Sequence, residues 1–386
     1  MKRRHFLYTS SIACLVPITA GLIGCTQTSS KSLDPKREVI VGGYSETDDQ
    51  GNRLDAHGVI IVQPNGSTDF DIISDFPVPY EVHLATLFPD KKHVLVCSRK
   101  PEASLLKYSI NGELQAELPP LNNQHFEGHG IFSIDEKYIY VTASDYHLKQ
   151  GRLLKLSSQN LSLEKDYFSG GVGPHELVWQ SDVQIAIANT GVLTHPDTER
   201  KALNLADMTS NISLFNSETE SINHQWHVPL QGLSARHLDR MDNGSLVIGC
   251  QYQKKDQRPA CIAFADINNG LVFAAEKNDF FYWNMKGYTA SIKAVPNSSS
   301  AIITNPQGHL LTQWQMTQNT PLGSELINKT KIDYNKGLKI SLNGDSAWLS
   351  IGAGKLQHID LINPTANNSA SSQIKSNIWW GNHLGS

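Results

Sequence analysis

The sequence predicts an all-β fold, a seven-bladed β-propeller closed by N- and C-terminal strands that share one blade. Seven short runs rich in β-branched residues recur, and long amphipathic helical patterns are absent. One marked position in each repeat recurs at spacings of 45 to 62 residues, close to the ~40–50 residues of four-stranded blades. The two ends also supply complementary parts of one repeat.

The β-branched runs are the expected second strands of the blades. They are EVIVGGY (38–44), HVLVCSR (93–99), YIYVTAS (138–144), VQIAIAN (183–189), SLVIGCQ (245–251), SAIITN (300–305) and AWLSIG (347–352). Six are preceded by a shorter segment and a turn such as Asp-Asn-Gly or Asn-Gly-Asp, which favour hairpins. A third strand follows each run, as in GRLLKLS (151–157), and a more irregular fourth segment completes the blade.

The termini predict how the ring closes. WWGNHLGS (379–386) has no strand after it, and EVIVGGY (38–44) and HGVIIVQ (57–63) have no first strand before them. Together they make one blade, which removes the open sheet edge that the ring would otherwise expose. A six- or eight-bladed ring is the alternative count. A β-sandwich would give no reason for the regular register.

The first residues are typical of an export address. Residues 1–24 carry the pair Arg3 and Arg4 before Phe6-Leu7, then a short apolar run that ends at Cys25, a pattern of twin-arginine lipoprotein signals. We therefore assign residues 1–24 to a signal peptide, 25–36 to a tether lipidated at Cys25, and 37–386 to the propeller. A generic secretory signal with a chance cysteine is the alternative.

This address predicts the periplasmic face of a bacterial envelope, with the lipid membrane as a partner through Cys25. Thr26 and Gln27 follow Cys25 instead of an Asp, which favours the outer membrane over the inner. Cleavage would leave 30 basic against 37 acidic residues, and no basic stripe stands out, so nucleic acid is not an expected partner. We expect Cys97, Cys250 and Cys261 to be buried thiols, with one disulfide as the alternative.

Histidine recurs at the marked position of the predicted inner strands. The marked residues are His83, His129, His175, His237, Ser291, Leu338 and His383. Because inner strands line the channel, several imidazoles could converge and bind iron, copper or zinc. Two other readings stay open. The histidines could bridge neighbouring strands as a packing motif, too far apart to share an ion, or they could line a pocket for a polar ligand.

A long polar insertion, GVLTHPDTERKALNLADMTSN (191–211), gives a second group of candidates. A long loop on a rigid scaffold often carries function. The candidate ligand or interface residues are His195, Asp197, Arg200 and Asn204, with Glu176 and Arg236 beside the inner-strand histidines. The alternative is that Arg200 and Asp197 pair and merely order the loop. We also expect Arg99, Gln251 and Tyr252 to reach this face.

Four stretches of this chain resemble an uncharacterised bacterial family of twin-arginine-exported seven-bladed propellers. They are EGHGIFSIDEKYIYVTASD, GGVGPHELVW, NTGVLTHPDTERKALNLADM and LSARHLDRMDNGSLVIGCQYQ, which hold the motifs GHG, GPHEL, THPD-x-x-R-x-x-LN and RHL. The resemblance implies partners among imelysin-like iron-regulated and di-haem peroxidase-like proteins, which are often encoded nearby. It implies no established activity.

We therefore expect a lipid-anchored binding or scaffold component of metal acquisition, with iron as the expected metal. No G-x-S-x-G, P-loop, Rossmann or HExxH motif is present. One alternative is a metal-dependent hydrolase or oxidoreductase that uses the histidines as ligands and Glu176 or Asp197 as base. The other is a protein-interaction platform whose channel is only structural.

Overall fold

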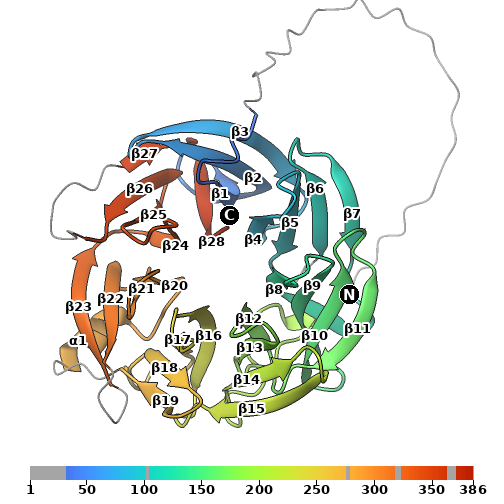
Figure 1. The fold of residues 1–386 in the computed structure, drawn as a ribbon, viewed down its shortest axis with the longest axis vertical. Helices are drawn as coiled ribbons and strands as arrows, with labels where there is room; N and C mark the ends of the chain where they lie inside the picture. The colour runs from blue at the N-terminus through green and yellow to red at the C-terminus, as the bar shows by residue number, and fades with distance from the viewer. Residues whose placement is uncertain (1–31, 101–103, 275–278, 318–322, 363–370, 386) are drawn as a thin grey trace, which may run out of the picture. The chain divides into compact units, whose positions relative to one another are not determined.

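The computed structural model describes residues 32–100, 104–274, 279–317, 323–362 and 371–385. Within them, seven four-stranded antiparallel sheets stand in a ring (Figure 1). This confirms the predicted seven-bladed propeller. The proposed signal peptide and most of the tether, with Cys25, lie outside the described residues.

Each of the first six blades is built from four consecutive strands, with the first strand nearest the channel. Blade 1 contains β4 (Val82–Leu87), β5 (His93–Ser98), β6 (Leu105–Ser109) and β7 (Leu114–Leu118). Blade 2 contains β8 (Gln124–Phe132), β9 (Tyr138–Asp145), β10 (Gln150–Ser157) and β11 (Leu163–Phe168). Blade 3 contains β12 (Pro174–Trp179), β13 (Gln184–Asn189), β14 (Asn211–Asn216) and β15 (Ser221–His227).

The next three blades follow the same plan. Blade 4 contains β16 (Leu233–Arg240), β17 (Leu246–Tyr252), β18 (Ile262–Asp266) and β19 (Gly270–Phe273). Blade 5 contains β20 (Ile292–Ala294), β21 (Ser300–Asn305), β22 (Leu310–Thr317) and β23 (Gly323–Lys331). Blade 6 contains β24 (Asn335–Ile340), β25 (Ser346–Ile351), β26 (Lys355–Asp360) and β27 (Ser371–Gln373).

Blade 7 joins the two ends of the chain, as predicted. The last strand, β28 (Ile378–Gly385), pairs with β1 (Ile40–Thr47), and β2 (Arg53–Asn65) and β3 (Asp69–Val78) complete the sheet. Leu384 lies opposite Gly42 in this antiparallel pairing. Hydrogen bonds between first and last strands therefore close the ring.

The core lies between neighbouring blades, because each sheet packs one face against the blade before it and the other face against the blade after it. The second strands are almost fully buried, which explains why they read as continuous apolar runs. Cys97, Cys250 and Cys261 are buried free thiols, as expected. The only helices among the described residues are α1 (Asp279–Met285) and the 3₁₀ helix η1 (Pro196–Thr198). Neither of these two helices is long and apolar enough to span a membrane.

The strand register corrects one marked position. In blades 1 and 7 the marked histidine directly precedes the leucines Leu84 and Leu384, each of which pairs with the second strand. In blade 6, Leu338 is the leucine that pairs with the second strand. The residue before it, Gly337, therefore occupies the histidine position. A Cβ on Gly337 would come within 2.9 Å of the backbone of His383 and Leu384 on β28. Close approach of the closing strand therefore requires a glycine here.

Candidate functional site

Five histidines from five blades meet in the channel, where they form what we call the histidine cluster. All five side chains are buried, and the marked positions are brought together as the sequence predicts: His83, His129, His175, His237 and His383. The strand pairing shifts register around each of them. Such bulges re-aim side chains and recur beside functional sites.

His129 lies at the middle of the cluster. Its ring centroid is 4.6 Å from those of His175 and His383, 4.7 Å from that of His83, and 6.1 Å from that of His237. Nε2 of His83 and Nε2 of His129 are only 2.9 Å apart. The reading that the imidazoles lie too far apart to share an ion is therefore wrong.

Two groups of three ring nitrogens are close enough to coordinate one ion. In each group the nitrogens lie within 4.8 Å of one another; the groups are His83 with His129 and His175, and His129 with His237 and His383. His129 belongs to both. Three imidazoles with an open position are a common arrangement for a zinc or other transition-metal ion.

Burial disfavours the charged form of four of the five imidazoles. It lowers the pKa values of His83, His175 and His383 well below the usual range, and the neighbouring imidazoles lower them further. Burial also lowers the pKa of His129 to about 4. Nε2 of His383 is buried without a hydrogen-bond partner. Neutral rings with free lone pairs are the form in which histidine binds metals.

Glu176 fixes the orientation of one imidazole. Its Oε2 accepts hydrogen bonds from Nδ1 of His237, at 3.1 Å, and from the backbone N–H of Leu238, at 3.2 Å. Burial alone would raise the pKa of Glu176, but the His237 hydrogen bond and nearby charges, including Lys293, lower it to about 2. His237 therefore presents Nε2 to the channel. Metal-binding histidines are commonly oriented by a carboxylate in this way.

A cavity of about 240 Å³ lies on one side of the cluster, and we call it the arginine cavity. His83, His175 and His237 line it together with Arg99, Lys100, Glu127, Thr194, Arg200, Arg236, Gln251, Tyr288 and Asn382. Of the residues expected on this face, Arg99 and Gln251 are present. Tyr252 does not line it and donates to Asp256 at 2.8 Å.

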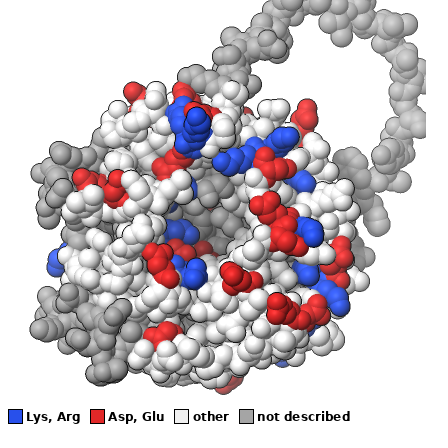
Figure 2. All heavy atoms as spheres, in the orientation of Figure 1, with Lys and Arg blue, Asp and Glu red and all other residues white. Residues whose placement is uncertain are grey.

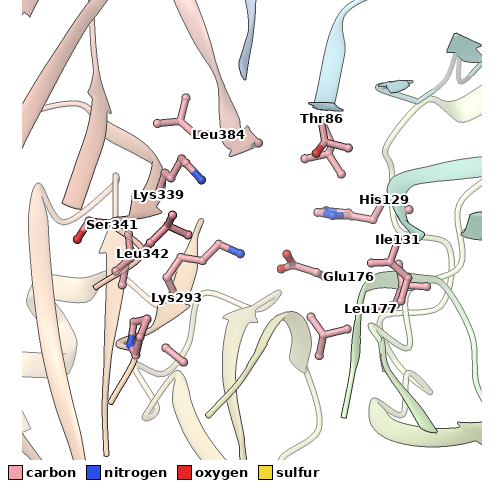
Figure 3. A pocket seen from close by; sticks show the side chains of 17 residues that line it. Thr86, His129, Ile131, Glu176, Leu177, Lys293, Lys339, Ser341, Leu342 and Leu384 are labelled. Atoms are coloured by element: carbon pink, nitrogen blue, oxygen red, sulfur yellow. The ribbon is translucent and has the colours of Figure 1, made fainter. Parts of the chain in front are cut away.

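A second cavity of about 390 Å³, the lysine cavity, reaches the cluster at His129. Lys293, Lys339 and Glu176 extend polar groups into it from different blades, and leucine and isoleucine side chains form much of its wall (Figure 3). Lys293 lies 4.0 Å from Asp239. Figure 2 shows that the ring is hollowed at its centre and that basic and acidic side chains border the hollow.

The insertion loop contributes less to the site than the sequence suggested. Asn204 fixes the loop, since it donates to the carbonyl of Gly191 and accepts from the N–H of Leu193. His195 caps η1 and contacts Tyr146. Neither residue lines the arginine cavity.

The alternative reading, in which Arg200 and Asp197 pair to order the loop, is wrong. Arg200 lies 3.6 Å from Glu81 in the connection before blade 1, while the exposed Asp197 lies 3.6 Å from His195. Asp197 lines neither cavity, so it is not placed to act as a base there. Of the loop candidates, only Arg200 reaches the site.

Sequence reasoning missed the lysines. Lys293 and Lys339 stand two residues after Ser291 and Gly337, the histidine-equivalent positions of blades 5 and 6. Alternate residues of a strand share one face, so both point into the channel. The spacing of two residues from the histidine-equivalent position could have identified both lysines. These blades have no histidine at that position, so the spacing was overlooked.

A ring of seven four-stranded sheets around a side-chain-lined channel defines this protein as a β-propeller. Its sequence from 76 to 386 matches the family described as "Protein of unknown function (DUF1513)", and the chain belongs to that family. This confirms the family resemblance at that level, while the export route and the genomic neighbours remain predictions. No curated protein matches the sequence.

Solved structures share the fold at low sequence identity. Hydrazine synthase of Kuenenia stuttgartiensis is 9% identical, with a TM-score of 0.57 over 83% of this chain and 93% of that chain. The periplasmic gluconolactonase PpgL of Pseudomonas aeruginosa is 11% identical, with a TM-score of 0.56 over 89% and 99%. The Dos1 propeller is 11% identical, with a TM-score of 0.51 over 81% and 76%. These likenesses show the propeller fold alone.

Proposed function

We propose that this propeller binds one transition-metal ion through its histidine cluster and serves as a component of metal acquisition, with iron as the metal. The convergence of five buried imidazoles from five blades is the observation that carries the proposal. The chain would be held by a lipid on Cys25 at the periplasmic face of the outer membrane. Imelysin-like and di-haem peroxidase-like proteins are its proposed partners.

The spacing of ring nitrogens supports a shared ion. Two neighbouring ligands at ~2.1 Å from an octahedral ion lie ~3.0 Å apart, and those around a tetrahedral ion lie ~3.4 Å apart. Nε2 of His83 and Nε2 of His129 are 2.9 Å apart. This contact is a hydrogen bond, so one of the two Nε2 atoms must give up its proton before both can bind one ion, with a third nitrogen from His175.

The packing alternative requires every imidazole to be satisfied by the protein. The buried, unpartnered Nε2 of His383 weighs against it, because a buried polar atom left without a partner costs ~1–3 kcal/mol. A metal ion would remove that cost, because it would accept the lone pair of this nitrogen.

A metal-dependent hydrolase or oxidoreductase is the second candidate. It is favoured by the arginine cavity, which gives a small substrate access to three of the histidines. Glu176 is the remaining candidate base, but its hydrogen bond to His237 suits an orienting role better than proton transfer.

Metal content tests the proposal. We expect the full chain, purified after export by its own leader, to hold close to one transition-metal ion per chain by elemental analysis. His129→Ala should remove the ion because His129 belongs to both ligand groups. The exposed His227 on β15 provides the matched control, His227→Ala, which should retain it.

Two results would contradict the proposal. One is a wild-type chain with far less than one ion after incubation with Fe²⁺, Cu²⁺ and Zn²⁺. The other is a His129→Ala variant that keeps its metal. If His129→Ala is metal-free but also strongly destabilised without metal, the packing role is favoured.

A further inference from the structure

Arg236 is a guanidinium in the channel without a carboxylate. It precedes His237 on β16, at the register shift between Ala235 and His237, and its side chain lines the arginine cavity. Its Nε is buried without a hydrogen-bond partner, and no ion pair of Arg236 exists among the described residues. Arginine stays protonated under almost all conditions, so its charge needs an anion or solvent.

The remaining acidic groups near the cavity are already engaged. Glu127 accepts from Lys100 at 2.7 Å, from Ser144 at 2.7 Å, and interacts with His125 at 3.0 Å. Burial alone would raise the pKa of Glu127, but Lys100 and His125 hold it well below the usual range. The charge of Glu127 does oppose the fall that burial causes in the pKa of Arg236, but among the described residues Glu127 forms its ion pair with Lys100 and none with Arg236.

A second carboxylate, that of Glu81, forms ion pairs with three guanidinium groups. Glu81 lies 2.8 Å from Arg99, 3.4 Å from Arg53 and 3.6 Å from Arg200. Arg99 and Arg200 line the same cavity as Arg236. The described walls of the arginine cavity therefore carry an excess of positive charge.

A metal ion in the histidine cluster would increase this excess. An imidazole that binds a metal adds no negative charge to offset it, and His83, His175 and His237 line the arginine cavity directly. A buried positive charge beside other positive charges is unfavourable unless an anion compensates it. Carboxylate and phosphate oxygens can bind a metal and also accept the paired hydrogen bonds of guanidinium groups.

We propose that the arginine cavity binds a small oxyanion of the carboxylate or phosphate class, held by Arg236 with Arg99 and Arg200 and placed to complete the coordination of the clustered metal. The metal contact rests on the proposed function, but the arginine contacts do not. The cavity volume of about 240 Å³ compares with ~30 Å³ for one water, so it has room for phosphate or a small polycarboxylate. The proposed metal therefore arrives with, or acquires, an anionic ligand.

Calorimetric titration of the metal-free full chain with inorganic phosphate and with citrate tests this inference. We expect saturable binding of at least one of them, at one per chain. Arg236→Gln should weaken that binding about 10- to 100-fold, the loss of one or more charge-assisted hydrogen bonds. The exposed Arg240 on the same strand gives the control Arg240→Gln, which should bind as wild type does.

Arg236→Lys is a second variant that keeps the charge but loses the planar fork. We expect it to bind more weakly than wild type and more tightly than Arg236→Gln, with an unchanged thermal midpoint. Adding a bound metal should raise the anion affinity of wild type, and by linkage the anion should raise the metal affinity equally.

The inference is overturned if neither anion binds saturably to wild type, or if Arg236→Gln and Arg240→Gln weaken binding equally. Such a result leaves the metal proposal standing if elemental analysis still finds the ion. If the chain binds an anion but takes up no metal, the anion site in the arginine cavity is supported and the metal proposal is contradicted.

Discussion

Replacing Glu176 by glutamine isolates the contribution of one carboxylate to the histidine cluster. The change keeps the size of the side chain and leaves a carbonyl oxygen that can accept from His237 and Leu238. The substitution removes a negative charge. In wild type that charge orients His237 and makes its ring a better metal ligand. Loss of a carboxylate behind a metal-binding histidine typically weakens the metal 10- to 100-fold.

The stability effect follows from the lowered pKa of Glu176. A fall from the usual 4.5 to about 2 corresponds to about 3.5 kcal/mol as an upper figure, at ~1.4 kcal/mol per pKa unit. Since part of each hydrogen bond survives in glutamine, we expect the free energy of unfolding at pH 7 to fall by about 1–3 kcal/mol. Because the folded-state pKa is depressed, this stability is present above pH 4.5 and lost as the pH falls towards 2.

Urea unfolding of the metal-free chain at several pH values measures the effect on stability. Competition with a chromophoric chelator measures the effect on metal affinity. Exposed Glu164 on β11 gives the matched control Glu164→Gln, which should change neither quantity. The difference in stability between wild type and Glu176→Gln should shrink below pH 4.5. A Glu176→Gln variant with wild-type stability and wild-type metal affinity would refute the orienting role.

Three further predictions concern the scaffold. Burial, followed by the charges of Arg53 and Arg99, lowers the pKa of Lys336 to about 6. The stability should therefore rise with pH between about 6 and 10.5, and Lys336→Met should raise the thermal midpoint at pH 7 and flatten this rise. Gly337→Ala should lower the free energy of unfolding by about 1–3 kcal/mol in urea titrations, because its Cβ would meet β28 at 2.9 Å; unchanged stability would contradict the close packing. Dithiothreitol should leave the thermal midpoint unchanged, since the described cysteines are free thiols; a fall would reveal a disulfide.

The ring could be predicted from the sequence because its signals are local and repeated. Each blade repeats a hairpin turn, a buried second strand and a third strand, so an error in one copy is corrected by the others. The one misplaced position fell in blade 6, where Gly337 has no side chain to mark the register and the neighbouring Leu338 was taken instead.

The wrong and missing parts of the site depend on contacts distant in sequence. The alternative of an Arg200–Asp197 pair considered only residues within the loop, whereas Arg200 lies beside Glu81, more than a hundred residues earlier. Lys293 and Lys339 were missed because blades 5 and 6 carry no histidine in the channel. Whether side chains from separate blades meet depends on the diameter of the channel and on the bulges that aim them, and neither follows from the repeat alone.

The placement of His383 links the pairing of β28 with β1 to assembly of the histidine cluster. β28 is the last described strand to leave the ribosome, yet it occupies the inner position of the blade that begins with β1. A nascent chain that has built the first six blades still lacks one imidazole of the five, and one of the two ligand groups, until this strand inserts. An ion taken up earlier would meet His83, His129, His175 and His237 but not His383, so the second group of three histidines is complete only after β28 has paired with β1.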